Sequence, residues 1–330
     1  MNAASAAISA MPARSRSDSR AVNRFAWAVL AYNVAVVLWG AAVRATGSGA
    51  GCGDHWPLCN GTVIQHHPTA ATLIEFAHRS MSGIALLAVI GLLFWTFRAV
   101  PRRHLARAAS VAALVLTLNE ALLGALLVLL GKVAHDQSAS RAVYLALHLT
   151  NTLLLLAALA LTAHFLSREQ GFMRGSVEFR APGFAFTGLA AVLVVGVSGS
   201  LAALGDTLFP ASSLRAALAQ DFASSSSWLV RVRWVHPAVS LIAGAFLLWL
   251  VYYGLRSTAN RTLSITLAGL LLLQYSLGVA DIALLAPTWM QMLHLLGADL
   301  LWIALIVLVA RLCVRPIGCT EGLCPIKGSR

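Results

Sequence analysis

Long apolar runs separated by short polar segments make up most of the chain. A helix that crosses the hydrocarbon core of a membrane needs about 20 mostly apolar residues. The sequence contains eight such runs. They predict spanning helices near residues 25–43, 73–97, 108–130, 142–166, 184–204, 232–254, 263–285 and 288–310. We therefore expect an all-α polytopic membrane protein with eight transmembrane helices.

The eight predicted helices fall into two similar halves. Three pairs of short segments match between the halves, and each half has a long outer loop followed by a short one; the matching segments are 118–124 with 273–278, 147–149 with 293–295, and 77–79 with 235–237. Both halves enter the membrane in the same direction, so we expect a parallel repeat of two pseudo-symmetric four-helix bundles. The expected divisions are a tail at 1–24, an N-terminal half at 25–166, a linker at 167–183, a C-terminal half at 184–310 and a tail at 311–330.

Composition and charge support a membrane protein and give its orientation. The chain is 59% hydrophobic and 11% charged, whereas soluble domains carry roughly 25% charged residues. The net charge of +12 does not indicate nucleic-acid binding, because the basic residues lie between apolar runs and no nucleic-acid motif is present. Of the 24 basic residues, 17 fall in the two tails and in the loops on the same side as the tails; they are Arg14, Arg16, Arg20, Arg24, Arg98, Arg102, Arg103, Arg107, Arg168, Arg174, Arg180, Arg256, Arg261, Arg311, Arg315, Lys327 and Arg330. This bias predicts that both termini are cytoplasmic. Residues 1–24 lack the apolar core of a signal peptide and are expected to form a disordered cytoplasmic tail.

Four histidines occupy the four even-numbered spans, one on each. His78, His148, His236 and His294 each lie about five to six residues past the predicted outer end of the span, which is roughly 8–9 Å deep at 1.5 Å per residue. Two imidazoles at one depth can bind one haem iron axially inside a helical bundle. We expect His78 with His148 to form one haem site and His236 with His294 a second. The alternatives are helix–helix hydrogen bonds and zinc, which would need further ligands.

Other polar groups within the predicted spans are fewer. Glu75 lies three residues before His78 and four before Arg79, so on a helix it shares a face with both. This cluster is either functional or an interfacial anchor. Glu120 and Asp281 are expected at interhelical contacts, and Asp299 is expected to face away from its neighbour His294. The remaining histidines are predicted in outer loops or at the cytoplasmic surface; they are His55, His66, His67, His135, His104 and His164.

The cysteines divide between the two sides of the membrane. Cys52 and Cys59 lie in the first outer loop, where an oxidising compartment favours a disulfide over two free thiols. Cys313, Cys319 and Cys324 lie in or beyond the last helix, on the reducing side. The spacing of Cys319 and Cys324 is a weak metal-binding signal, and the sequence assigns these three cysteines no role.

Three motifs in order resemble the haem A synthase family. They are Val43-Arg44-Ala45-Thr46-Gly47-Ser48-Gly49, then Cys52 with Trp56-Pro57-Leu58-Cys59-Asn60-Gly61, then Ile74-Glu75-Phe76-Ala77-His78-Arg79. Together with the four histidines and the duplicated plan, the resemblance covers all eight spans. It implies oxidation of the C8 methyl of haem O to a formyl group, for cytochrome oxidase assembly, in a bacterial-type inner membrane. Some members carry a second cysteine pair in the later outer loop, which this chain lacks.

The resemblance also implies residue roles and partners. By position, His78 and His148 would bind the substrate haem, and His236 and His294 a cofactor haem b. Glu75 matches the family's important acidic residue, and could shuttle protons or stabilise a cationic intermediate. Cys52 and Cys59 match the family's first-loop pair. Haem O synthase and an electron donor are the expected partners, although the sequence identifies neither the donor nor the oxygen source and leaves the oligomeric state open, a homo-oligomer included.

Two functions from other classes fit parts of the sequence. A two-haem b-type electron carrier or quinol oxidoreductase explains the four histidines equally well, but not Glu75 or the cysteine loop. A transporter with a duplicated fold explains the repeat, but not four histidines at one depth. The pigment bound to the protein distinguishes the enzyme from the carrier.

Overall fold

A computed structural model of the chain describes residues 13–63, 67–167, 177–179 and 183–316. Eight of its helices are long and apolar enough to cross a membrane, by length and composition. They are α2 (Ala13–Ala45), α3 (Ala70–Ala99), α4 (Leu105–Leu129), α5 (Ala139–Leu166), α6 (Gly183–Leu208), α9 (Val235–Leu255), α10 (Thr258–Ala283) and α11 (Thr288–Cys313). Each predicted span is recovered, with ends displaced by several residues, so the all-α eight-helix prediction is confirmed.

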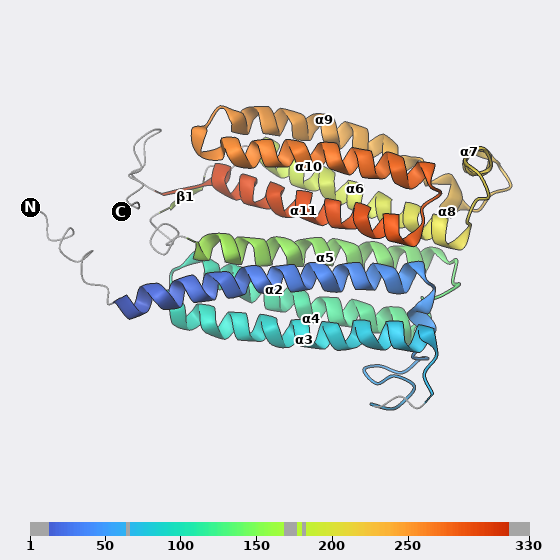
Figure 1. The fold of residues 1–330 in the computed structure, drawn as a ribbon, viewed down its shortest axis with the longest axis horizontal. Coiled ribbons are helices and arrows are strands. Elements are labelled where there is room, and N and C mark those ends of the chain that lie inside the picture. Colours follow the sequence, from blue (N-terminus) through green and yellow to red (C-terminus); the bar gives the residue numbers. More distant parts are fainter. Residues whose placement is uncertain (1–12, 64–66, 168–176, 180–182, 317–330) are drawn as a thin grey trace, which may run out of the picture.

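The long helices pack as two rings of four. Helices α2, α3, α4 and α5 each contact the next in that order, and α5 closes the ring on α2. Helices α6, α9, α10 and α11 form the second ring in the same way. The rings meet where α5 and α2 contact α11 and α6, as Figure 1 shows with the blue-to-green and yellow-to-red groups. In each ring the two histidine-bearing helices therefore lie across a diagonal.

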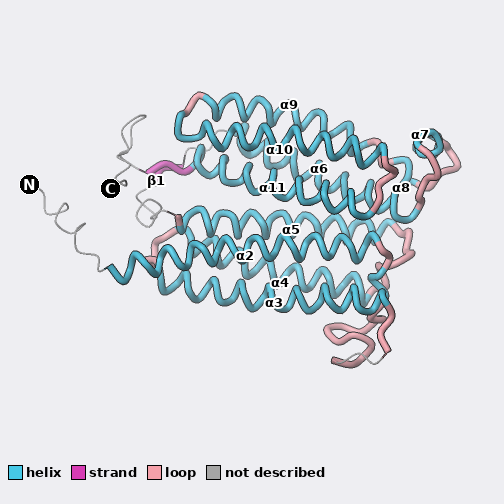
Figure 2. The backbone as a smooth tube through the Cα atoms, viewed as in Figure 1, coloured by secondary structure: helices cyan, strands magenta, loops and turns pink. Residues whose placement is uncertain are grey.

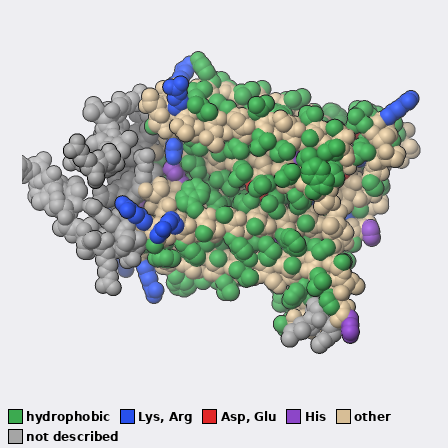
Figure 3. All heavy atoms as spheres, viewed as in Figure 1, with side chains coloured by type: hydrophobic (Ala, Val, Ile, Leu, Met, Phe, Trp, Pro, Cys, Tyr) green, Lys and Arg blue, Asp and Glu red, His purple; other side chains and the backbone are tan. Residues whose placement is uncertain are grey.

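The buried core lies where the rings meet. Helices α5 and α11 contribute many of its residues, including Leu156, Leu159, Leu305 and Leu308. The indole N–H of Trp302 in α11 donates to the Leu153 carbonyl of α5 at 2.7 Å. The outer faces are instead apolar and exposed, as at Leu87, Ile242 and Leu272. Figure 3 shows hydrophobic side chains over the length of the stack, and most of the visible lysines and arginines at one end. This distribution suits helices whose outer faces are covered by lipid.

Arg44, in the last turn of α2, also joins the two rings. Its guanidinium donates to the Ala203 carbonyl at 2.7 Å and the Thr207 hydroxyl at 2.8 Å, both on α6. A third bond, of 2.7 Å, reaches the Gln291 side chain on α11. Arg44, which belongs to the first sequence motif, therefore connects the N-terminal half to the C-terminal half.

Short elements complete the described chain, and most were not predicted. They are the 3₁₀-helix η1 (Ser48–Ala50), helices α7 (Leu214–Phe222) and α8 (Trp228–Arg231), and strands β1 (Val177–Phe179) and β2 (Val314–Pro316). The two strands pair antiparallel and join the linker to the segment after α11. Figure 2 shows the loops at the two ends of the helical stack.

The helix ends explain some differences from the sequence predictions. Side chains of Thr69, Ser138 and Ser213 accept a backbone N–H in the first turn of α3, α5 and α7, so helices α3 and α5 begin three residues before the predicted spans. Helix α2 begins at Ala13, so residues 13–24 are helical although a disordered tail was predicted. His104 caps α4 and, like His164, is buried. His66, Cys319 and Cys324 lie outside the described residues.

Candidate functional site

All four predicted histidines lie within the first three turns of a long helix. His236 also follows soon after the short helix α8. His78 is on α3, His148 on α5, His236 on α9 and His294 on α11. The Nδ1 atoms of His78 and His148 make no hydrogen bond among the described residues. Each half therefore brings two half-buried imidazoles toward one end of a four-helix ring.

The second pair has the separation that an iron between two imidazoles requires. The ring centroids of His236 and His294 are 6.2 Å apart and their planes are nearly perpendicular, at 88°. A metal held about 2 Å from one nitrogen of each ring places the centroids roughly 6 Å apart. The residues present therefore fit an iron coordinated by both histidines, as a haem b would provide.

Each histidine ring also rests against a glycine of the helix that precedes it. A Cβ added to Gly40, Gly199 or Gly278 would lie 2.8, 2.9 or 3.1 Å from Cε1 of His78, His236 or His294. The corresponding distance from Gly124 to His148 is 3.8 Å. The contacts at Gly40 and Gly199 leave no room for a Cβ unless the ring moves, and the one at Gly278 would need a small shift of the ring, so glycine lets the rings lie close to the neighbouring helix. The sequence did not predict this role, although Gly124 and Gly278 end the two matching segments.

Glu75 holds the first outer loop on α3. Its side chain is buried, and its two oxygens accept the Cys52 backbone N–H at 2.8 Å and the Arg79 guanidinium at 2.6 Å. The predicted Glu75–Arg79 pair is therefore confirmed. Two charged or polar donors offset the cost of burying a carboxylate at this depth.

The same arginine fixes the loop from its other side. Arg79 also donates to the carbonyls of His55 and Leu58, at 2.6 and 2.7 Å. Cys52 and Cys59, on either side of these two residues, form the predicted disulfide, and both cysteines are buried. Gly51 packs against the first turn of α3 so closely that an added Cβ would lie 2.4 Å from a backbone carbon of Ala71. The loop is thus attached to the helix that carries His78.

The matching position in the second half carries a base instead. Arg233 lies three residues before His236, as Glu75 lies three before His78. It is buried and bonded to Asp206 at 2.9 Å and to Asp221 of α7 at 2.8 Å. Helix α7 therefore replaces the disulfide loop as the structure that covers this bundle, in keeping with the absence of a second cysteine pair.

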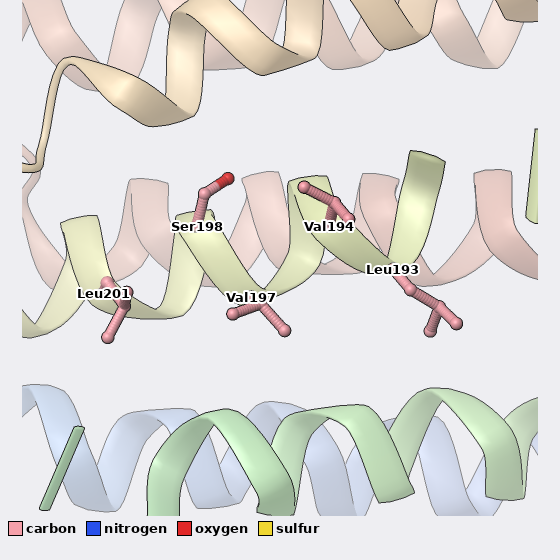
Figure 4. Close-up of a pocket in the computed structure, with 5 residues that line it drawn as sticks. All are labelled: Leu193, Val194, Val197, Ser198 and Leu201. Carbon is pink, nitrogen blue, oxygen red and sulfur yellow. The ribbon is translucent and has the colours of Figure 1, made fainter. Parts of the chain in front are cut away.

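His236 contacts two uncharged polar groups of α6. Its Nδ1 lies 3.2 Å from the Val195 carbonyl and from the Ser198 hydroxyl, both on α6. Ser198 also lines a groove of about 290 Å³ with four aliphatic residues of α6, namely Leu193, Val194, Val197 and Leu201. Figure 4 shows the aliphatic side chains along this helix and the Ser198 hydroxyl pointing away from Val197 and Leu201. The groove on α6 beside Ser198 is therefore largely apolar, and the groups that meet His236 Nδ1 are uncharged.

Two further polar groups of α11 are buried. Asp299 on α11 is fully buried, and neither carboxyl oxygen has a hydrogen-bond partner among the described residues. Cys313 is buried in the last turn of the same helix. No group of three or more His, Cys, Asp or Glu side chains that could hold a metal ion by themselves occurs in the described ranges.

Comparison with known proteins gives the class to which this site belongs. Residues 23–306 match the COX15-CtaA family, described as cytochrome oxidase assembly protein. The chain belongs to this family, so the predicted relationship to haem A synthases is confirmed.

Individual relatives carry two different names. The chain is 45% identical over 291 residues to a Thermus thermophilus protein named protoheme IX farnesyltransferase, covering 86% of this chain and 47% of that protein. It is 41% identical over 126 residues to a heme A synthase of Alkalihalophilus pseudofirmus, covering 38% of this chain and 40% of that one. A heme A synthase of Exiguobacterium is 39% identical over 124 residues, or 38% of each chain. The chain thus spans about half the length of the first of these relatives.

Proposed function

We propose that the chain is a haem A synthase, which oxidises the C8 methyl of haem O to a formyl group by successive hydroxylations. The observation that carries the proposal is the position of Glu75. This carboxylate is buried, held by Cys52 and Arg79, and lies three residues before a histidine of the N-terminal pair. An electron carrier needs two haem sites but has no need of a buried acid beside one of them.

The two histidine pairs receive different roles in this proposal. His78 and His148 hold the substrate haem O, and His236 and His294 hold a resident haem b, which supplies electron-transfer chemistry. The 6.2 Å separation of the second pair supports the latter assignment. Haem O synthase, which would supply the substrate, and an electron donor are the proposed partners.

Glu75 can act near the reacting carbon in two ways. A buried carboxylate held by two donors stabilises positive charge that develops nearby, and it can also accept a proton. Its hydrogen bond to Cys52 places the disulfide loop over the same end of the bundle. The loop would thereby exclude water from the substrate while the acid is held in position.

The farnesyltransferase name of one relative does not transfer to this chain. The alignment leaves more than half of that relative's length outside it. The name therefore does not show which portion of that relative carries out prenyl transfer. No observation on the described residues of this chain favours that reaction.

Extraction of the pigment from membranes tests the proposal. A host that makes haem O, and that lacks its own haem A synthase, should contain haem A or hydroxylated haem O when this chain is expressed. His236→Ala and His294→Ala should each remove haem b from the purified protein. A protein that carries haem B alone, with haem O unchanged in the membrane, would show that the chain is an electron carrier instead.

A further inference from the structure

Glu120 on α4 faces the histidine that the proposed function assigns to the substrate haem. Its Oε1 lies 3.4 Å from His148 Nδ1. That separation is longer than an ordinary hydrogen bond, and Nδ1 makes no other hydrogen bond among the described residues. When Nε2 of a histidine binds iron, Nδ1 carries the proton, and a facing carboxylate is its usual acceptor. A small movement of either side chain completes this bond.

A cluster of amides and hydroxyls holds the carboxylate in place. Asn151 and Thr152, one turn after His148 on α5, both donate to Glu120. Asn151 is itself fixed by the Leu116 carbonyl at 2.9 Å and by the Asn119 amide at 2.8 Å. The helix that presents the histidine therefore also orients the acid. A cluster of this size within a membrane helix pair is costly unless its members are satisfied, which indicates a function beyond packing.

The other three histidines form no ion pair with a carboxylate among the described residues. His236 Nδ1 approaches a backbone carbonyl and a serine hydroxyl, and the Gln274 side-chain amide nitrogen lies 3.3 Å from both Nδ1 and Nε2 of His294. His78 Nδ1 has no hydrogen-bond partner in the part of the chain that the structure describes. Among the four histidines, His148 is therefore the one whose ring nitrogen lies within 4 Å of a carboxylate oxygen in the described ranges.

Glu120 and Gln274 occupy the same place in the two halves. Each lies four residues before the glycine that faces the histidine of the next helix, Gly124 for His148 and Gly278 for His294. The side chains have nearly the same shape and differ in charge. The matched pair therefore compares an anionic with a neutral side chain at the same place relative to the histidine, although Glu120 also accepts hydrogen bonds from Asn151 and Thr152.

We propose that Glu120 is a positioning residue that makes His148 a strongly electron-donating haem ligand. This inference rests on the proposed function and deepens it. An anionic hydrogen-bond acceptor raises the basicity of a histidine ligand and stabilises the more positive, ferric state of its iron. Gln274 does not do this for His294. The oxidation chemistry is thereby assigned to the haem of the N-terminal half, and electron transfer to the haem of the C-terminal half.

Redox titration of the purified, haem-loaded full chain tests this assignment. Glu120→Gln should raise the midpoint potential of the N-terminal haem, recognised as the component that His148→Ala removes, and leave the other haem unchanged. Gln274→Glu should lower the potential of the haem that His294→Ala removes. Gln274→Glu tests the effect of the carboxylate even if Glu120→Gln does not retain its haem, because it adds a carboxylate at the matching place in the other half.

The outcomes separate this inference from the proposed function. Loaded Glu120→Gln protein with an unshifted potential overturns the role of Glu120, as does a Gln274→Glu protein whose potential is unshifted or raised. If His78→Ala and His148→Ala leave the haem content unchanged, the N-terminal haem site itself is wrong. A shift in both haems on Glu120→Gln would indicate a general structural effect and would also overturn the assignment.

Discussion

At the scale of single residues, glycine decides how closely each histidine approaches the neighbouring helix. Histidine alone at a helix start would leave its ring in contact with lipid or with a bulkier neighbour. The glycines at positions 40, 199 and 278 remove that obstacle and let the ring lie against backbone. The site therefore depends on residues that carry no chemistry of their own.

Gly278→Val tests this dependence. The added side chain would meet the His294 ring, and overpacking of this kind costs about 1–3 kcal/mol, so haem b affinity should fall by roughly tenfold or more. Gly269→Val on the same helix is the matched control, because a Cβ there meets nothing within 4 Å. The measurement is haem b per protein after purification. Equal haem content in the two variants would contradict the role given to Gly278.

Part of the site was predictable from residue spacing and part was not. The Glu75–Arg79 pair follows from four-residue helical spacing, and the Cys52–Cys59 disulfide follows from its compartment. The predicted interhelical contact of Glu120 is confirmed by its bonds to α5, but its contact with His148 was not predicted. It depends on how α4 is rotated against α5, and helices that are apolar on every side do not reveal their facing sides in the sequence.

At the scale of elements, the first outer loop is held by α3. Arg79 forms two of the bonds that attach it, to the His55 and Leu58 carbonyls, and a third to Glu75 of the same helix, which itself accepts the Cys52 backbone N–H of the loop. The hydropathy pattern predicted the long helices because membrane spans have a strong sequence signal. It did not predict α7, α8 or the β1–β2 pair, since short elements whose packing is tertiary carry little local signal.

Arg79→Met should release the loop. The variant keeps much of the apolar stem but removes all three bonds, so the disulfide should be reduced about tenfold faster by a membrane-impermeant reductant. Arg215→Met provides the control, since Arg215 is an exposed arginine of the other long outer segment. Alkylation of the released thiols over time measures the rate. Equal rates in the two variants would show that Arg79 does not secure the loop.

At the scale of the whole molecule, two four-helix rings share one buried interface. Arg44 and Trp302 cross it, and its core residues come largely from α5 and α11. The repeat of short motifs predicted two halves, and the helices do pack in two groups. The pseudo-symmetry between them stays a prediction, supported by the four glycine–histidine contacts.

The predicted orientation in the membrane rests on the distribution of basic residues, and reporter fusions test it. The basic residues favour the side that holds the loop after α3, so a reporter fused after Arg102 should report a cytoplasmic location. A reporter fused after Ser226, in the segment between α7 and α8, should report the outer side. The reverse pattern would place both termini outside and would remove the oxidising compartment from the disulfide.

The central claim is that this chain oxidises haem O, with Glu75 acting in turnover. The most direct measurement supplies purified protein with haem O, a chemical reductant and oxygen, and follows the porphyrin products by chromatography and mass. The natural chain should form haem A, whereas Glu75→Gln should be folded, retain haem b and leave haem O or a hydroxylated intermediate. Haem A formed at the normal rate by Glu75→Gln, or haem O left unchanged by the natural chain, would contradict the account.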